Sequence, residues 1–165
     1  MFAHLKLKSI TIPSSVTLIG INAFVGCEFL NTIVFEDSST PLQVSCQKTS
    51  YDRGPFYHSP LTSITLGREI SYCYDGVDGF EDTFIPTATE DGLFASEAEV
   101  ESLSVTLSSN VKTILDYMFA GTPIKQLVIP GTVTTIGNNV FNECDKLTSL
   151  TFEPSPTGEA LTLGY

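Results

Sequence analysis

The sequence predicts a β-rich solenoid of about six coils of roughly 23 residues, with a parallel sheet on one face and two coils enlarged by insertions. Two observations lead to this fold class. First, a pattern of Ile, Pro, Gly, Phe and Cys runs from Leu7 to Cys27 and recurs from Ile124 to Cys144, offset by 117 residues throughout. Self-similarity with a period of about 20–50 residues is typical of solenoids, whose units bury their apolar faces against one another. Second, strand-like starts of the form L-x-x-φ-x-φ, in which φ is apolar, recur along the chain at Leu7, Leu30, Leu61, Ser102, Ile124 and Leu147.

The first half of each unit is expected to be a strand. In the first unit Ile10 and Ile12 alternate with Ser9 and Thr11, which predicts one apolar and one polar face. Pro13 follows directly, and proline cannot continue a hydrogen-bonded ladder. The same alternation gives the inward-facing pairs of the later units: Ile33 and Phe35, Ile64 and Leu66, Val105 and Leu107, Leu127 and Ile129, and Leu150 and Phe152.

The second half of each unit is expected to contain a turn, a short strand-like piece such as Leu18–Ile19, and then a single helical turn or loop. A phenylalanine recurs in this last part of every full unit: Phe24, Phe56, Phe94, Phe119 and Phe141. Large rings at equivalent positions of stacked coils predict a buried aromatic row along the solenoid.

Two units are stretched by insertions, at about residues 36–53 and 67–92. Residues 42–45 and 68–72 within them have the pattern of extra strands on successive coils. No polar cap is recognisable before Leu7, and the tail at 161–165 stops in the middle of a unit. Because solenoids usually carry polar caps, we expect residues 1–165 to form a single solenoid domain that belongs to a longer repeat protein.

The four cysteines fall into two groups. Cys27 and Cys144 occupy the same place in their units, four coils apart, and are expected to be small buried residues rather than a disulfide. Cys46 and Cys73 follow the two inserted strands, where a disulfide between them is geometrically possible. Neither histidine is spaced with the cysteines as in a zinc site, and the acidic loop at 75–82 lacks the ligand order of a calcium loop, so no metal or cofactor is predicted.

Composition and motifs exclude several classes of function. The net charge of −11 and the absence of a basic cluster argue against binding to nucleic acid or to anionic membranes. No run approaches the roughly 18 apolar residues of a membrane span. None of the nucleophile, phosphate-binding or zinc-protease motifs occurs, so the chain is predicted not to be an enzyme.

The repeat resembles the BspA-like (Treponema pallidum-type) leucine-rich repeat, which occurs in surface proteins. The similarity is carried by the run from Leu7 through Pro13, Ile19-Gly20 and Ala23-Phe24 to Cys27, and by its copy at 124–144. In the fourth unit, which starts at Ser102, Ala120-Gly121-Thr122 stands where the family has cysteine. The resemblance implies a bacterial or protist protein that is extracellular, at the cell surface or secreted. It implies a curved leucine-rich-repeat solenoid that acts in adhesion or protein binding.

Two surfaces are candidates for such binding. One is the outward face of the sheet, where Ser and Thr dominate two rows of positions. The other is the inserted region, which gathers aromatic and basic side chains: Tyr51, Arg53, Tyr57, His58, Arg68, Tyr72 and Tyr74. Three hypotheses follow: a module that recognises a host or neighbouring-cell protein, a purely structural spacer in a larger surface protein, and a carbohydrate-binding β-solenoid.

Overall fold

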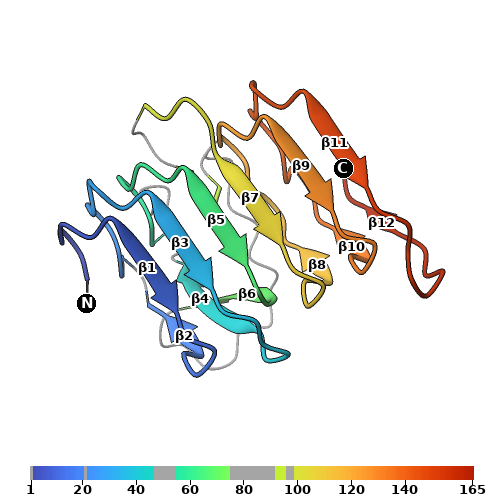
Figure 1. The fold of residues 1–165 in the computed structure, drawn as a ribbon, viewed down its shortest axis with the longest axis horizontal. Helices are drawn as coiled ribbons and strands as arrows, with labels where there is room; N and C mark the ends of the chain where they lie inside the picture. Colours follow the sequence, from blue (N-terminus) through green and yellow to red (C-terminus); the bar gives the residue numbers. More distant parts are fainter. Residues whose placement is uncertain (1, 21, 47–54, 75–91, 96–98) are drawn as a thin grey trace.

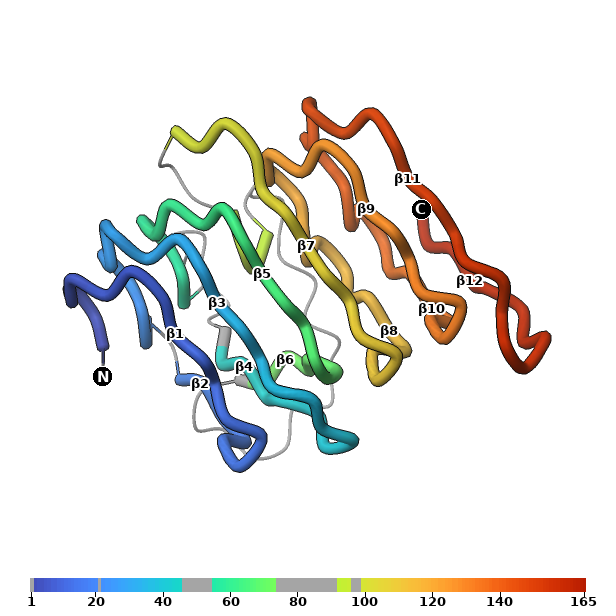
Figure 2. Tube along the Cα trace, viewed as in Figure 1, coloured from blue at the N-terminus to red at the C-terminus, as the bar shows by residue number. Residues whose placement is uncertain are grey.

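The computed structural model describes residues 2–20, 22–46, 55–74, 92–95 and 99–165. These residues form a β-solenoid in which parallel strands stack along one axis, as Figure 1 shows. No helix occurs within the described residues. The predicted fold class is therefore confirmed. Figure 2 shows how the successive coils lie side by side in chain order, from the N-terminus to the C-terminus.

The first face of the solenoid carries the predicted strands, one from each coil. It contains β1 (Ser9–Ile12), β3 (Thr32–Phe35), β5 (Ser63–Leu66), β7 (Ser104–Leu107), β9 (Gln126–Ile129) and β11 (Ser149–Phe152). The first four form one parallel sheet and the last two another, all with equivalent repeat positions paired. Ile10 thus pairs with Ile33, and Ile33 with Ile64, so that each apolar position repeats directly above its copy.

A second face carries another set of parallel strands, which extends the prediction of a sheet on one face. One sheet there contains β2 (Leu18–Ile19), β4 (Leu42–Cys46) and β6 (Ile70–Tyr74), and the other contains β8 (Thr113–Ile114), β10 (Thr135–Ile136) and β12 (Thr162–Leu163). β4 and β6 confirm the extra strands expected in the insertions. Their register sets Cys73 opposite Ser45 and Tyr74 opposite Cys46, so the two cysteines are diagonal neighbours rather than a directly opposed pair.

The predicted aromatic row is confirmed along the remaining edge of the core. Its ring centroids lie between 5.4 and 6.2 Å apart, and successive planes are tilted by 22° at most. Phe2 extends the row beyond the predicted members by stacking on Phe24 at 5.4 Å. Phe24 and Phe119 are almost fully buried, whereas Phe141 at the last full coil is half-buried. The row in order is Phe2, Phe24, Phe56, Phe94, Phe119 and Phe141.

The turns that carry these rings repeat one backbone conformation. The residue two positions after the ring has a positive φ in five coils: His4, Gly26, His58, Gly121 and Glu143. This left-handed region favours glycine, yet three of the five residues carry side chains. The turns are also bonded to one another, as in the hydrogen bond from the Gly26 N–H to the Tyr57 carbonyl at 3.0 Å. The third side of the solenoid is therefore regular in these five described turns.

The family's cysteine position is a buried hydrogen-bond donor. The Cys27 thiol donates to the Phe2 carbonyl at 3.0 Å, and the Cys144 thiol donates to the Phe119 carbonyl at 3.0 Å. Ser59 occupies the same place in its coil and donates to the Phe24 carbonyl at 3.2 Å. The expectation of buried cysteines that do not bridge each other is confirmed. Thiol and hydroxyl groups serve equally, because either satisfies a carbonyl of the neighbouring coil.

The coil that contains β7 is one residue shorter than its neighbours at the start of the strand. In other coils the buried residue before the strand stands three positions ahead of the first inward residue, as Leu30 does before Ile33. Here Leu103 takes that buried place only two positions before Val105, whereas the repeat pattern assigned the start to Ser102. An isolated bridge pairs Leu103 with Ile124. The strands that follow, β7 and β9, are not paired with each other and belong to different sheets. One missing residue thus interrupts the first face.

Candidate recognition surfaces

The residues predicted as a binding cluster on the insertions do not gather on one surface where the structure describes them. Tyr57 and His58 lie in a turn, Tyr72 lies on β6, and Arg68 is inside the protein. Tyr51 and Arg53 lie outside the described residues, as does the side chain of Tyr74.

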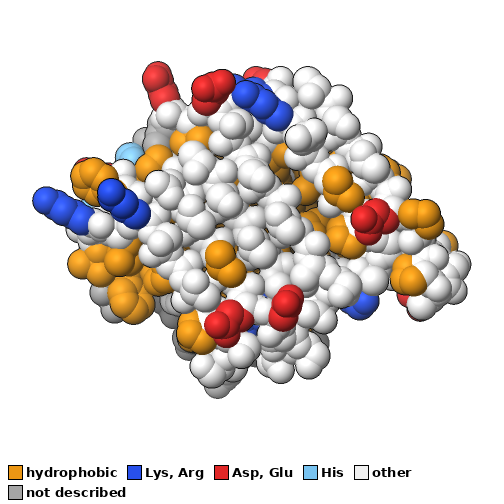
Figure 3. Space-filling view, in the orientation of Figure 1, with side chains coloured by type: hydrophobic (Ala, Val, Ile, Leu, Met, Phe, Trp, Pro, Cys, Tyr) orange, Lys and Arg blue, Asp and Glu red, His pale blue; other side chains and the backbone are white. Residues whose placement is uncertain are grey.

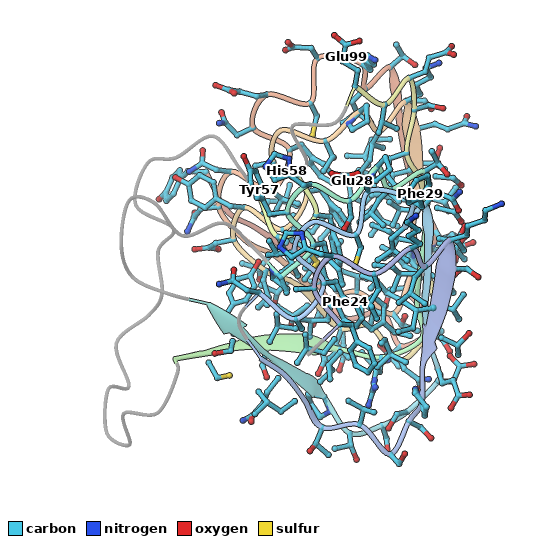
Figure 4. The ribbon with its side chains drawn as sticks, turned by 90° about the vertical axis from the view of Figure 1, so that its left-hand side faces the viewer. Phe24, Glu28, Phe29, Tyr57, His58 and Glu99 are labelled. Carbon is cyan, nitrogen blue, oxygen red and sulfur yellow. The ribbon has the colours of Figure 1, made fainter. Side chains whose placement is uncertain are left out.

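Tyr57 and His58 form a small aromatic pair on the turn side of the solenoid. Their ring centroids are 3.9 Å apart with planes tilted by 56°, and His58 is exposed while Tyr57 is half-buried. Figure 4 shows both labelled side chains together on this side, away from the strands of the first face. The positive φ of 60° at His58 turns the chain so that this imidazole faces outward. Among the described residues the two rings form one compact pair.

Tyr72 is half-buried on the second face and contacts the following coil. Its hydroxyl donates to the Asp116 carbonyl at 3.3 Å. The backbone N–H of Lys112 donates to the Glu69 carboxylate at 3.1 Å nearby. These side-chain bonds connect β6 to the coil that contains β8, although the two strands belong to different sheets. Tyr72 therefore has a structural role in joining two coils.

Arg68 is fully buried, which removes it from the predicted binding set. Its guanidinium donates to three backbone carbonyls in the first coil: Pro13 at 2.9 Å, Ser14 at 3.1 Å and Val16 at 2.8 Å. Burial lowers the pKa of Arg68 from its ordinary value, and the Glu36 carboxylate acts in the opposite direction. The sequence suggested a surface cation because basic residues are rarely buried without partners, and the pattern gave no sign of these carbonyls.

The outward face of the first sheet presents two rows of small polar residues. Pairing places Ser9, Thr32, Ser63 and Ser104 in one row and Thr11, Val34, Thr65 and Thr106 in the other. Gln126 with Ser149 and Val128 with Thr151 continue the rows on β9 and β11. In Figure 3 the centre of this face is free of coloured charged side chains, which lie toward its rim.

A groove interrupts this face where β7 and β9 part. It has a volume of about 540 Å³, and its lining comes from β7, β9 and β11 together with the segments that follow them. Hydroxyl side chains such as Thr106 and Thr151 line it beside apolar ones such as Val105 and Leu127. Glu153 is the one charged residue in the lining, all of which lies in the described range 99–165. Sequence reasoning missed this groove, although the late position of Leu103, only two residues before Val105, was its signal.

The described part of the structure also bears on metal binding and on membrane spanning. No group of three or more His, Cys, Asp or Glu side chains there is placed to hold a metal ion. The same residues contain no helix that is long and apolar enough to cross a membrane.

Comparison with known proteins identifies the repeat. A family model described as the BspA type leucine-rich repeat region, with six copies, matches residues 1–88 and 71–158. The chain therefore belongs to the BspA-type leucine-rich repeat family. Proteins of this family are typically located at the surface or secreted, and leucine-rich-repeat solenoids typically serve as non-enzymatic scaffolds that bind proteins. Neither the curated proteins nor the solved structures contain a match to this chain.

Proposed function

We propose that this chain is a non-enzymatic module at the cell surface or in the secreted space that recognises a protein and contributes to adhesion. The observation that carries the proposal is the first face, where hydroxyl-bearing side chains stand in register across successive strands and the centre is free of charged side chains. Solenoids use such extended faces for recognition. Membership of a family of surface repeat proteins supports the same conclusion.

The chemistry of this face defines what it can bind. Ser and Thr side chains both donate and accept hydrogen bonds, and their small size leaves the face flat. The face lacks the Tyr, Trp and Arg side chains that concentrate binding energy in most interfaces, so affinity must come from area and from the groove beside β9. The overall charge of −11 disfavours nucleic acid as the partner.

The experiment is a pull-down of the purified chain against extracellular-matrix proteins and glycans at physiological salt. One variant carries Thr65→Arg and Thr106→Arg on the sheet face, and a second carries Tyr57→Ser and His58→Ser on the turn side. A matched control adds the same two charges to the exposed β11–β12 loop through Thr157→Arg and Ala160→Arg. We expect a protein partner that is lost only in the sheet-face variant.

The other outcomes each point elsewhere. Loss in the turn variant alone would move the site to Tyr57 and His58. A glycan in place of a protein would favour the carbohydrate-binding hypothesis. No captured partner across the panel would favour the structural spacer and would count against recognition. Circular dichroism and thermal midpoints of all variants establish that each one is folded.

A further inference from the structure

We propose that the seam between β7 and β9 is a docking slot for an extended, uncharged segment of a partner protein, which binds by adding its backbone to the two open strand edges. This inference rests on the proposed recognition function. It specifies where on the first face the partner protein binds and which contacts it makes. It starts from the missing residue before β7 and from the hydrogen bonds that the two strands make on their other sides.

On β7 the backbone groups that face the seam are those of Val105 and Leu107. Parallel strands use alternate residues to bond the neighbour on each side. The N–H groups of Ser104 and Ser108 donate toward β5, each over 2.9 Å, to the carbonyls of Thr62 and Leu66. The odd-numbered residues of β7 therefore direct their N–H and C=O groups toward β9.

On β9 the corresponding groups belong to Gln126 and Val128. The Lys125 and Ile129 carbonyls accept hydrogen bonds, each over 2.9 Å, from the N–H groups of Thr148 and Glu153, which flank β11. By alternation, Gln126 and Val128 direct their backbone groups to the opposite side. Within the described range 99–165, the Leu103–Ile124 bridge is the pairing that joins β7 to β9. Between the described residues of these two segments the backbone hydrogen bond is that from the Leu103 N–H to the Pro123 carbonyl at 3.0 Å, ahead of both strands. The seam thus presents two facing strand edges of four residues each, which are not bonded to each other.

The chemistry of the lining selects the occupant. A strand edge binds another extended backbone, and side-chain pockets beside it set specificity. The groove of about 540 Å³ is lined by Ser, Thr, Gln, Val, Leu and Pro with one acidic residue, Glu153. That lining fits small apolar or hydroxyl side chains, and it offers no cation for a phosphate or an acidic peptide. The occupant is therefore a neutral, strand-forming segment of a protein.

The second face allows the slot to open. A strand placed between two others needs about 10 Å between the outer two, because neighbouring strands lie about 4.8 Å apart. β8 and β10 remain paired on the second face, with Thr135 opposite Thr113 and Ile136 opposite Ile114. The two coils are joined on that side, and on the turn side by bonds such as that from the Gly121 N–H to the Asn142 carbonyl at 2.8 Å. A segment would therefore enter by separating the strands of the first face alone.

The first test needs no ligand. Hydrogen–deuterium exchange of the free protein is measured amide by amide at neutral pH. We expect rapid exchange at Val105, Leu107, Gln126 and Val128, and slow exchange at Thr65 and Thr106 in the paired part of the sheet. Slow exchange at the four seam amides would show that β7 and β9 are paired in solution and would overturn the proposal.

The second test uses peptides selected from a displayed library of random twelve-residue sequences. Val128→Pro removes one N–H from the seam, and Val128→Thr keeps that N–H at the same exposed position. We expect selected peptides to protect the seam amides from exchange, to bind Val128→Thr as they bind the natural chain, and to bind Val128→Pro about tenfold more weakly or worse. Equal affinity for both variants, or an absence of selected peptides, would contradict the slot.

The two proposals can fail separately. If the pull-down finds a protein partner that leaves the seam amides unprotected and is insensitive to Val128→Pro, recognition stands and the slot is wrong. If the panel yields no partner while selected peptides occupy the seam, the slot stands as a peptide-binding site and the proposed adhesion to an extracellular-matrix protein is wrong. Thermal midpoints of both Val128 variants keep a folding defect from being mistaken for a binding defect.

Discussion

Arg68 lies just after β5, yet its guanidinium binds carbonyls in the turn that follows β1, two coils away. A buried charge is tolerated only when its donors are satisfied, and here three carbonyls with a nearby Glu36 carboxylate supply that environment. The Arg68 Nε is buried without a partner, so one of the donors of the guanidinium makes no hydrogen bond. The side chain ties the first coil to the third.

We predict that Arg68→Met lowers the free energy of unfolding by roughly 3 kcal/mol, because three carbonyls lose charged donors while the apolar stem is kept. Urea unfolding at pH 7 measures the change. Lys112→Met is the control: Lys112 is exposed and its ammonium bonds one carbonyl, that of Ser109. A loss no larger than that of the control would show that the buried bonds contribute little.

The Cys144 thiol predicts a pH dependence. Burial raises the pKa of Cys144, and the hydrogen bond with Thr122 opposes this shift. In the unfolded chain the thiol ionises near its ordinary value of about 8.5, so the unfolded state loses its proton first. The stabilisation by the protonated thiol is therefore complete below about pH 8.5 and declines as the pH rises further.

We expect the natural chain to lose more stability than Cys144→Ser between pH 7 and pH 10, because the serine hydroxyl does not titrate there and can make the same bond to Phe119. Paired urea titrations at the two pH values measure this difference. Parallel pH curves for the two proteins would mean that the thiol is not the titrating group.

The aromatic row predicts unequal effects for its members. Phe24 is buried between Phe2 and Phe56, so Phe24→Ala is expected to cost roughly 3–5 kcal/mol. Phe141 is half-buried and stacks on one ring, Phe119, so Phe141→Ala should cost about half as much. Chemical denaturation of both variants measures these values. Near-neutral midpoints for both would contradict stacking in the core.

At the scale of elements, the repeat made the strands of the first face and the phenylalanine row predictable. A strict period places equivalent residues in the same environment, so the strand and the buried positions of one unit predict those of the other units. The β4 and β6 strands were also accessible, because their alternation is visible inside the insertions. The outward rows of the sheet, the candidate site on this face, followed from the same alternation.

The features that escaped prediction break the period or depend on a single contact. Leu103 stands one residue late in its unit, so the pattern placed the strand start at Ser102 and gave no sign of the seam. Arg68 is buried because of carbonyls in another coil, which no local pattern records. Short strands such as β2 were expected one by one, but their pairing into a second face was not, because two residues are too few to show alternation.

The short spacing between Leu103 and Val105 can be lengthened by mutation. We predict that one asparagine inserted between Leu103 and Ser104 restores the three-residue spacing of the other coils and lets β7 pair with β9. Exchange at Gln126 and Val128 should then become slow, and selected peptides should no longer bind. Unchanged rapid exchange in a folded insertion variant would show that coil length is not the cause of the split.

At the scale of the whole molecule, the acidic charge is a cost to stability. A net charge of −11 makes the folded chain repel itself, and salt screens repulsion between exposed charges. We therefore expect the thermal midpoint to rise as sodium chloride increases from low to high concentration. Differential scanning calorimetry checks this at constant pH. A midpoint that falls with salt would indicate that attractive pairs such as Lys125–Glu101, at 3.4 Å, outweigh the repulsion.

The breaks in the two faces fall on opposite sides of one coil. The coil of β7 and β8 is bonded to the preceding coil through the first face, by β5–β7, and to the following coil through the second, by β8–β10. Force carried by the sheets therefore crosses from the first face to the second inside this coil, while the turn side stays bonded across it, as by the Gly121 N–H to the Asn142 carbonyl at 2.8 Å. Under tension we expect this coil to bend more readily than the coils on either side, where both sheets continue from one coil to the next. In a surface protein with this arrangement, the length of one repeat would determine where the protein bends under force.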